Sequence, residues 1–150
     1  MTCAVLFSIS LALAASPALS QAAVPQSEVM APVYSFFDAI AHRDKAAMLA
    51  QTVPDTAVTI SREGGLRHLT IDNLADLVVN IKSGSLAEPI HDPIVQVDNN
   101  IASVWAPFVF TIDGTPTNCG TDIFTLAKLN GKWLIVNLTY NSQKNCESAR

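Results

Sequence analysis

Apolar side chains in the first half of the chain recur at helical spacing. In "APVYSFFDAIAHRD" they fall at positions i, i+3, i+4 and i+7, which is one face of a helix: Val33, Phe36, Phe37 and Ile40. Pro32 suits a first turn, so we expect this helix to begin close to it. A second, shorter helix is expected over residues 44–53, where Pro54 stops it. A third is expected over residues 70–84, with Thr70 as its N-cap.

The remaining segments alternate apolar and polar positions, which is typical of half-buried strands. We expect these strands over residues 56–62, 66–70, 93–98, 101–113, 119–129 and 132–140. Asn99-Asn100 and Asn130-Gly131 are two-residue hairpin loops, and Pro107 indicates a bulge or an edge. This order predicts an α+β fold, in which three helices of the N-terminal half cover one face of a curved antiparallel sheet.

The last predicted hairpin indicates which side chains share a face. With Asn130-Gly131 as the loop, Asp122 lies opposite Thr139 and Phe124 lies opposite Asn137, and opposed residues share a face. That face is apolar around Trp133 and becomes polar towards Asp122, so we expect a pocket at the polar end. The other face is also rich in apolar residues, which predicts a homodimer or a covering segment.

The N-terminus has the pattern of an export signal. Residues 1–26 carry no charged side chain, and Ala4–Ala15 is too short to span a bilayer. No Lys or Arg precedes this apolar segment, which is unusual for a signal peptide. We therefore predict a signal peptide over residues 1–22, a domain over residues 23–150, and a periplasmic or secreted protein without a membrane segment after cleavage.

Charge and cysteine content exclude several classes of function. The formal net charge is −4 and the isoelectric point about 5.1, which excludes a basic surface for nucleic acid or anionic membranes. In an oxidising compartment the two cysteines of the mature chain, Cys119 and Cys146, favour a disulfide over a catalytic thiol. In the strict register of the last hairpin, Cys119 lies opposite Ser142, four residues before Cys146. A disulfide therefore requires the tail to fold back or the strands to bulge. No metal or cofactor site is expected, because the histidines lack metal-ligand spacing.

Several motifs together resemble one superfamily over residues 28–146. They are Val104-Trp105-Ala106-Pro107, Asp113-Gly114, Cys119-Gly120-x-Asp122-x-Phe124-x-Leu126 and Gly131-x-Trp133-x-Ile135, followed by Cys146. The chain is similar to nuclear transport factor 2-like (cystatin-like) proteins, and more narrowly to the exported bacterial branch labelled "putative lumazine-binding". The resemblance implies a cone-shaped sheet, which in this superfamily hosts isomerases, dehydratases, cyclases and non-catalytic binding or assembly modules. The branch often has a histidine before the cysteine, where this chain has Asn118, and this lowers the expectation of catalysis.

Asp122 is the strongest candidate for chemistry. A carboxylate on the inward face beside Phe124 would be desolvated and its pKa raised, as a general base requires. The alternative interpretation is that Asp122 only accepts hydrogen bonds at the mouth of the cone. His68 is a second catalytic candidate, and the predicted ligand pocket comprises Tyr34, Phe37, Asp38, Trp105, Phe124 and Asn137.

These observations predict an exported protein that binds a small apolar or aromatic ligand. Two other functions stay open: a cofactor-independent lyase or isomerase with Asp122 as the base, and an assembly module with a filled interior.

Overall fold

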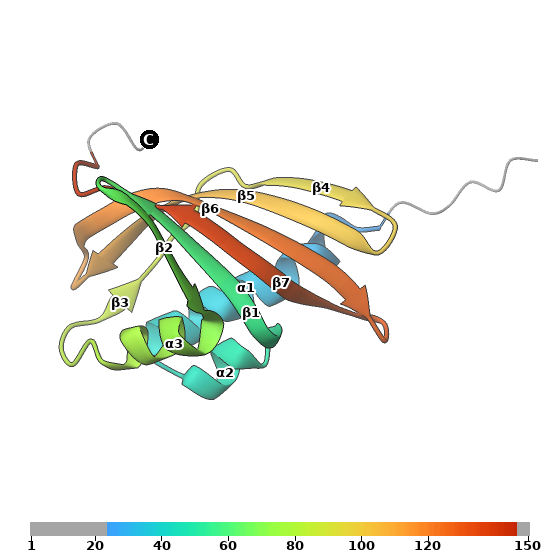
Figure 1. Ribbon diagram of the computed structural model, residues 1–150, viewed down its shortest axis with the longest axis horizontal. Coiled ribbons are helices and arrows are strands. Elements are labelled where there is room, and N and C mark those ends of the chain that lie inside the picture. Colours follow the sequence, from blue (N-terminus) through green and yellow to red (C-terminus); the bar gives the residue numbers. More distant parts are fainter. Residues whose placement is uncertain (1–23, 147–150) are drawn as a thin grey trace, which may run out of the picture.

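The structure, a computed structural model, describes residues 24–146 as one curved sheet with helices on one face (Figure 1). The predicted signal peptide, residues 1–22, lies outside the described residues. The elements in chain order are α1 (Gln26–His42), α2 (Lys45–Leu49), β1 (Thr52–Arg62), β2 (Gly65–Thr70), α3 (Ile71–Val79), β3 (Leu86–Ala87), β4 (Ile94–Asp98), β5 (Ile101–Ile112), β6 (Thr115–Leu129) and β7 (Lys132–Asn141).

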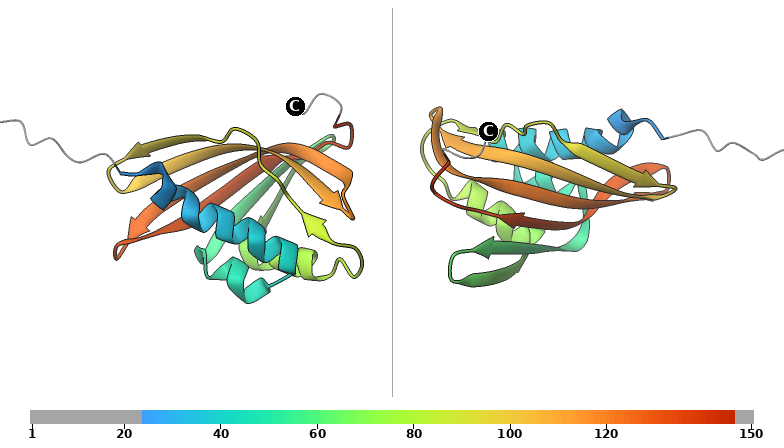
Figure 2. Two further views of the ribbon diagram at one scale, coloured as in Figure 1. Left: turned by 180° about the vertical axis from the view of Figure 1, so that it is seen from behind. Right: turned by 90° about the horizontal axis from the view of Figure 1, so that it is seen from above.

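The strands follow the order β2-β1-β7-β6-β5-β3, and β4 pairs with the same edge of β5. All pairs are antiparallel except β1 with β7, which is parallel. The three helices lie together on the concave face, and the other face of the sheet is left open (Figure 2). The predicted α+β architecture is therefore confirmed.

The helices differ from the prediction at their ends. α1 begins at Gln26, so Pro32 lies inside it, where its ring removes one backbone hydrogen bond. Packing accounts for this, because Pro32 and its neighbours Val29, Met30 and Val33 are all buried. The predicted N-cap of α3 is confirmed: the Thr70 side chain accepts a hydrogen bond from the Asn73 backbone N–H, at 3.3 Å.

The predicted β6–β7 register is wrong beyond Leu126. Leu126 pairs with Ile135 as expected, but Thr125 pairs with Asn137, so Val136 forms a bulge on β7. One extra residue moves every later side chain of β7 to the opposite face. Asp122 therefore lies opposite Tyr140 rather than Thr139.

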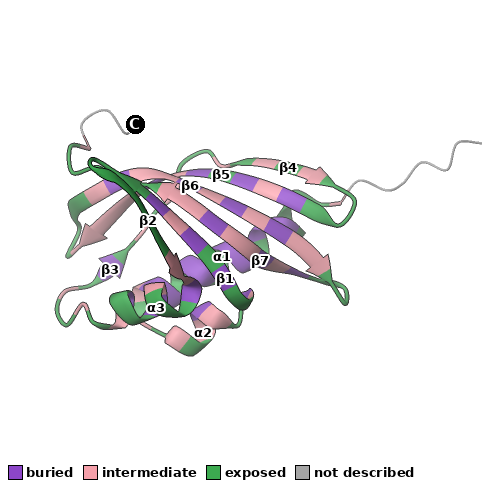
Figure 3. Ribbon diagram, in the orientation of Figure 1, coloured by how far each residue is buried: buried purple, intermediate pink, exposed green. Residues whose placement is uncertain are grey.

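One end of the concave face is solidly packed. The rings of Phe36, Phe37 and Phe124 form three edge-on contacts, with centroid distances of 5.6–6.2 Å. Leu126 and Ile135 continue this packing and are inaccessible to solvent. Buried residues alternate with exposed or partly exposed ones along β5 and β6, as a sheet with one covered face requires (Figure 3).

The C-terminal segment folds back over β6, and a disulfide holds it there. Cys119 is fully buried and bonded to Cys146, with 5.7 Å between the Cα atoms. Cys119 also exchanges two backbone hydrogen bonds with Gln143, at 2.9 and 3.0 Å. The bulge and the returning tail together close the gap that strict register would have left.

Candidate functional site

A cavity of about 180 Å³ lies at the end of the concave face opposite the aromatic core. Its walls are apolar and come from both helical and strand elements: Phe37 and Ile40 from α1, Leu74, Leu77 and Val78 from α3, and Phe108, Phe110 and Leu138 from the strands. Four polar residues that can hydrogen-bond also line it, together with Tyr140: Arg62, Glu88, Asn118 and Asp122. An apolar hollow with a few convergent polar groups is the usual form of a small-molecule site.

Asp122 is the most deeply placed of these polar residues. It is only 3% exposed, and its Oδ2 atom has no hydrogen-bond partner among the described residues. Burial raises the pKa of this carboxyl group well above its ordinary value, and the nearby carboxyl group of Glu88 raises it further. A buried acceptor without a partner is costly, so this atom is suited to a ligand.

Glu88 reaches the cavity from the segment that follows β3. This segment runs along the edge of β5, where the His91 N–H donates to the Pro107 carbonyl at 2.8 Å and the Val109 N–H donates to Pro89 at 3.2 Å. Glu88 as a whole is partly exposed, but burial of its carboxyl group raises its pKa to about 8. The cavity therefore contains two carboxyl groups with raised pKa values, and that of Glu88 lies near 8.

Arg43 fixes the chain that leads from α3 to Glu88. It ends α1, and its guanidinium group donates to the carbonyls of Ile81 and Gly84, and to that of Ser83 at 3.2 Å. The Ser85 N–H donates to the side chain of Asp113 at 2.8 Å. The position of Glu88 thus rests on contacts with two other elements.

Tyr140 completes the polar end of the cavity. Its ring packs edge-on against Phe108, with the centroids 6.3 Å apart. Burial raises the pKa of its hydroxyl group to about 12; the positive charge of Arg62 opposes this effect, while Glu88 and Asp122 add to it. Tyr140 is therefore a neutral hydrogen-bonding group at any physiological pH.

The structure places only some of the predicted site residues at this cavity. Asp122 and Phe37 line it, and Phe124 packs against Phe37 on the side away from it. Tyr34 and Asp38 lie on the exposed side of α1: Tyr34 is 54% exposed, and Asp38 contacts His42 at 3.5 Å.

Three further predicted residues lie on the open face of the sheet. Trp105 is 48% exposed between buried neighbours on β5. The bulge at Val136 turns Asn137 to this face as well, where it donates to the Ala57 carbonyl at 3.4 Å. His68 is exposed and its ring nitrogen lies 3.1 Å from the Thr59 hydroxyl, so the structure does not bring His68 and Asp122 together.

Sequence reasoning missed Glu88, Tyr140 and Arg62. Glu88 lies in a segment without periodicity, between Ala87 and Pro89, and no pattern there indicates a buried carboxyl group. Strict register assigned Tyr140 to the open face, and only the bulge corrects this. Alternation with Val58 and Ile60 could have found Arg62, because all three share one face of β1.

Neither a metal centre nor a membrane-spanning helix is found between residues 24 and 146. No three His, Cys, Asp or Glu side chains in this range are grouped so that they could hold a metal ion. Within the same range, every helix is too short or too polar to cross a bilayer.

Solved structures similar to this chain share its fold. A nuclear transport factor 2-like protein of unknown function from Shewanella baltica matches with a TM-score of 0.64 and 19% identity, over 80% of this chain and 94% of that one. A protein from Novosphingobium aromaticivorans, described as nuclear transport factor 2-like with a cystatin-like fold, matches with a TM-score of 0.67 and 16% identity, over 83% and 86%. A nuclear transport factor 2-like protein from Cytophaga hutchinsonii matches with a TM-score of 0.67 and 14% identity, over 81% of this chain and all of that one.

These similarities show the fold, because the identities are too low to carry a function. The search of curated proteins found no match. A family sequence model matches residues 25–141, which include nearly the whole described domain. The chain therefore belongs to the family described as "Putative lumazine-binding".

Proposed function

We propose that the protein binds one small, flat, largely apolar molecule in the cavity between α1, α3 and the sheet. The observation that carries this proposal is the unpartnered Oδ2 atom of Asp122, which is buried among apolar walls. A ligand that hydrogen-bonds to this atom relieves the cost of its burial and gains the apolar contacts as well.

The size of the cavity limits the ligand class. A volume of about 180 Å³ is slightly larger than an engineered cavity of about 150 Å³ that binds benzene. It is smaller than the roughly 300–1,000 Å³ of pockets for drug-sized ligands. The expected ligand therefore has one ring or two fused rings, a class to which lumazine, the molecule in the family description, belongs.

The protonated carboxyl groups favour a ring with an amide edge. A carboxylic acid donates through its O–H and accepts through its carbonyl, so it can form two hydrogen bonds to a ring that carries adjacent N–H and C=O groups. The raised pKa of Asp122 supports this role at neutral pH.

Calorimetry with lumazine and its 1,3-dimethyl derivative tests the proposal. We expect Asp122→Leu to weaken lumazine binding at least tenfold, and Asp122→Asn to retain it, because an amide still donates and accepts. The dimethyl derivative, which lacks the ring N–H groups, should bind weakly to all forms. Asp98→Asn, a change at an exposed carboxylate on β4, is the matched control. Equal affinity in wild type and Asp122→Leu would remove Asp122 from the site, and no binding of any single-ring or fused-ring amide would contradict the proposal.

A proton-transfer enzyme is the second candidate, and the pair of carboxyl groups favours it. Asp122 and Glu88 have raised pKa values in an apolar cavity, so the ionised form of either is a stronger base than an exposed carboxylate. In that case Asp122 is the general base of a lyase or isomerase. Asp122→Asn should then abolish turnover without unfolding the protein, whereas the binding function keeps its affinity for a neutral ligand. An assembly module does not need the cavity at all.

We also propose export and a homodimer. The uncharged N-terminal segment and the Cys119–Cys146 disulfide support export to an oxidising compartment. The open face of the sheet carries the exposed apolar residues Ile94, Ile101 and Trp105, which support pairing with a second copy. Light scattering on the purified protein should give twice the mass of the mature chain, and Trp105→Ser should lower it to one copy.

A further inference from the structure

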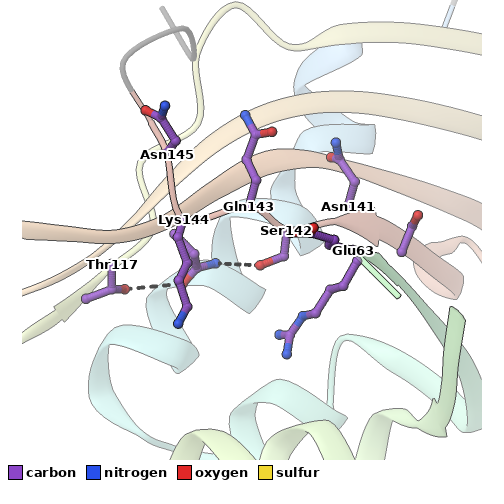
Figure 4. Close-up of a pocket in the computed structure, with 10 residues that line it drawn as sticks. Glu63, Thr117, Asn141, Ser142, Gln143, Lys144 and Asn145 are labelled. Carbon is purple, nitrogen blue, oxygen red and sulfur yellow. Dashed lines mark hydrogen bonds between the residues drawn. The ribbon is translucent and has the colours of Figure 1, made fainter. Parts of the chain in front are cut away.

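A groove of about 940 Å³, lined by polar residues, lies beside the cavity (Figure 4). The turn after β1, the start of β6 and the C-terminal segment from Asn141 to Asn145 form its walls. Arg62 and Asn118 line both the groove and the apolar cavity. The two spaces therefore lie next to each other, with Arg62 and Asn118 between them and within reach of both.

The groove contains two positive charges that have no carboxylate partner among residues 24–146. Neither Arg62 nor Lys144 forms an ion pair with any residue between 24 and 146, although the chain has four more acidic than basic side chains. Among the described residues that line the groove, Glu63 is the single acidic one, and it pairs with neither cation. Figure 4 shows that the Lys144 side chain extends to the opposite side of the C-terminal segment from Gln143.

The remaining side chains of the groove are hydroxyl and amide groups, and several are already held in place. The Asn118 amide donates to the Ser142 hydroxyl at 3.3 Å, and the Thr121 N–H donates to the Asn141 side chain at 2.6 Å. These contacts tie the tail to β6, and the disulfide fixes its far end. Lys144 is thus carried by an anchored segment, so its charge stays at the groove.

We propose that Arg62 and Lys144 bind the anionic group of a ligand whose ring occupies the cavity, so that the ligand is an aromatic or heteroaromatic carboxylic acid with a short linker. This inference rests on the proposed binding function and adds the ligand's charge and orientation. Arg62 is the principal residue, since it lines both spaces and its planar guanidinium group can hold a carboxylate through two hydrogen bonds.

The protonation of the cavity is compatible with an anionic ligand. The titratable or charged groups that face the ligand come from six segments: Arg62 of β1, Glu63 of the following turn, Glu88 of the edge segment, Asp122 of β6, Tyr140 of β7 and Lys144 of the tail. The walls that α1 and α3 contribute are apolar. At pH 6 the carboxyl group of Glu88, with its pKa near 8, holds its proton, and burial favours the neutral form of Asp122 as well, so repulsion of an anion is reduced. Above about pH 8 Glu88 loses its proton, and binding of an acid should weaken while binding of its neutral analogue does not.

Paired acids and amides test the inference. The probes are phenylacetate, 3-phenylpropanoate and 4-phenylbutanoate, each with its primary amide, titrated into the full chain at pH 6 with dissociation constants taken from NMR shift changes. For at least one of the three linker lengths, we expect the acid to bind at least tenfold more tightly than its amide. Arg62→Gln should reduce acid binding to the level of the amide, and Lys144→Gln should reduce it by a smaller factor. Lys132→Gln removes a positive charge at the distant β6–β7 turn and should change neither.

The outcomes separate this inference from the proposed function. Binding of an amide but no tighter binding of any acid overturns the charge assignment and leaves the cavity as a neutral site. An equal loss of acid and amide binding in Arg62→Gln shows that Arg62 positions Tyr140 rather than the anion, which also overturns the inference. Failure of all six probes to bind wild type that still binds lumazine overturns the inference and leaves the proposed function standing, whereas failure of lumazine as well overturns both.

Discussion

The two ends of the concave face differ although the same strands build them. At one end Phe124 and Leu126 of β6 are inaccessible to solvent and pack under α1. At the other end Asp122, two residues earlier on the same face, lies in a cavity, and its Oδ2 atom has no partner between residues 24 and 146. Phe37 separates the two, because its ring contacts Phe124 and also lines the cavity.

This difference comes from what covers each end. Two aromatic rings of α1 fill the first end, whereas the second is covered by the branched aliphatic side chains of α3 and by the edge segment that carries Glu88. Aliphatic walls leave room for a small ligand and desolvate the carboxyl groups among them. The filled end thus supplies stability, and the open end supplies binding and perturbed protonation.

The largest effect is expected at the filled end. Phe124→Ala removes a fully buried ring from the aromatic cluster and should lower the free energy of unfolding by about 3–5 kcal/mol. Urea denaturation measures this change. A loss below about 1 kcal/mol would mean that this end is not solidly packed.

Loss of the disulfide should have the next largest effect and should act on the open end. Cys146→Ser opens a link across a sequence separation of 27 residues and should cost about 3 kcal/mol. Hydrogen exchange measures where this occurs. Amides of residues 142–146 and of the start of β6 should lose protection. Amides around Leu126 and Ile135 should stay protected until the whole variant unfolds. Uniform loss across both ends would contradict the division between them.

A smaller effect is expected from the carboxyl groups. Because their pKa values are higher in the folded than in the unfolded protein, the folded state keeps protons that the unfolded chain releases. The contribution of these two carboxyl groups to stability should therefore be greatest below about pH 4. It should fall as the pH rises from 4.5 towards 8.

The double variant Asp122→Asn, Glu88→Gln removes both ionisable groups and therefore removes the fall in stability between pH 4.5 and 8. We expect it to be more stable than wild type by roughly 2 kcal/mol at pH 8 and nearly equal at pH 4, in urea titrations at both pH values. The control pair Asp98→Asn, Glu63→Gln changes exposed carboxylates and should leave the slope unchanged. If the free energy of unfolding of Asp122→Asn, Glu88→Gln falls with pH as steeply as that of wild type, the pH dependence belongs to other groups.

The fold was predictable from the sequence because its signals are local. The alternation of β5 and β6, the Asn130-Gly131 turn and the Thr70 cap each depend on a few neighbouring residues, and the structure confirms all three. α1 was predicted too short because Pro32 normally indicates a helix start, and only its buried surroundings show why it is tolerated here.

The site was less predictable because it depends on register and on a segment without periodicity. The alternation of side chains along β6 correctly predicted that Asp122 points inward. The bulge at Val136, however, places Leu138 and Tyr140 on the inner face, where strict register had placed Asn137. Glu88 reaches the cavity through long-range contacts along β5, which no local pattern encodes.

The most direct test of the account is the titration of Asp122 and Glu88 followed by carbon-13 NMR of their carboxyl carbons, assigned with Asp122→Asn and Glu88→Gln. The account predicts that both groups stay protonated at pH 6 and that Glu88 titrates near pH 8. Two ordinary titrations near pH 4 would show that water reaches both carboxyl groups, and would contradict a desolvated, ligand-sized cavity at the open end of the sheet.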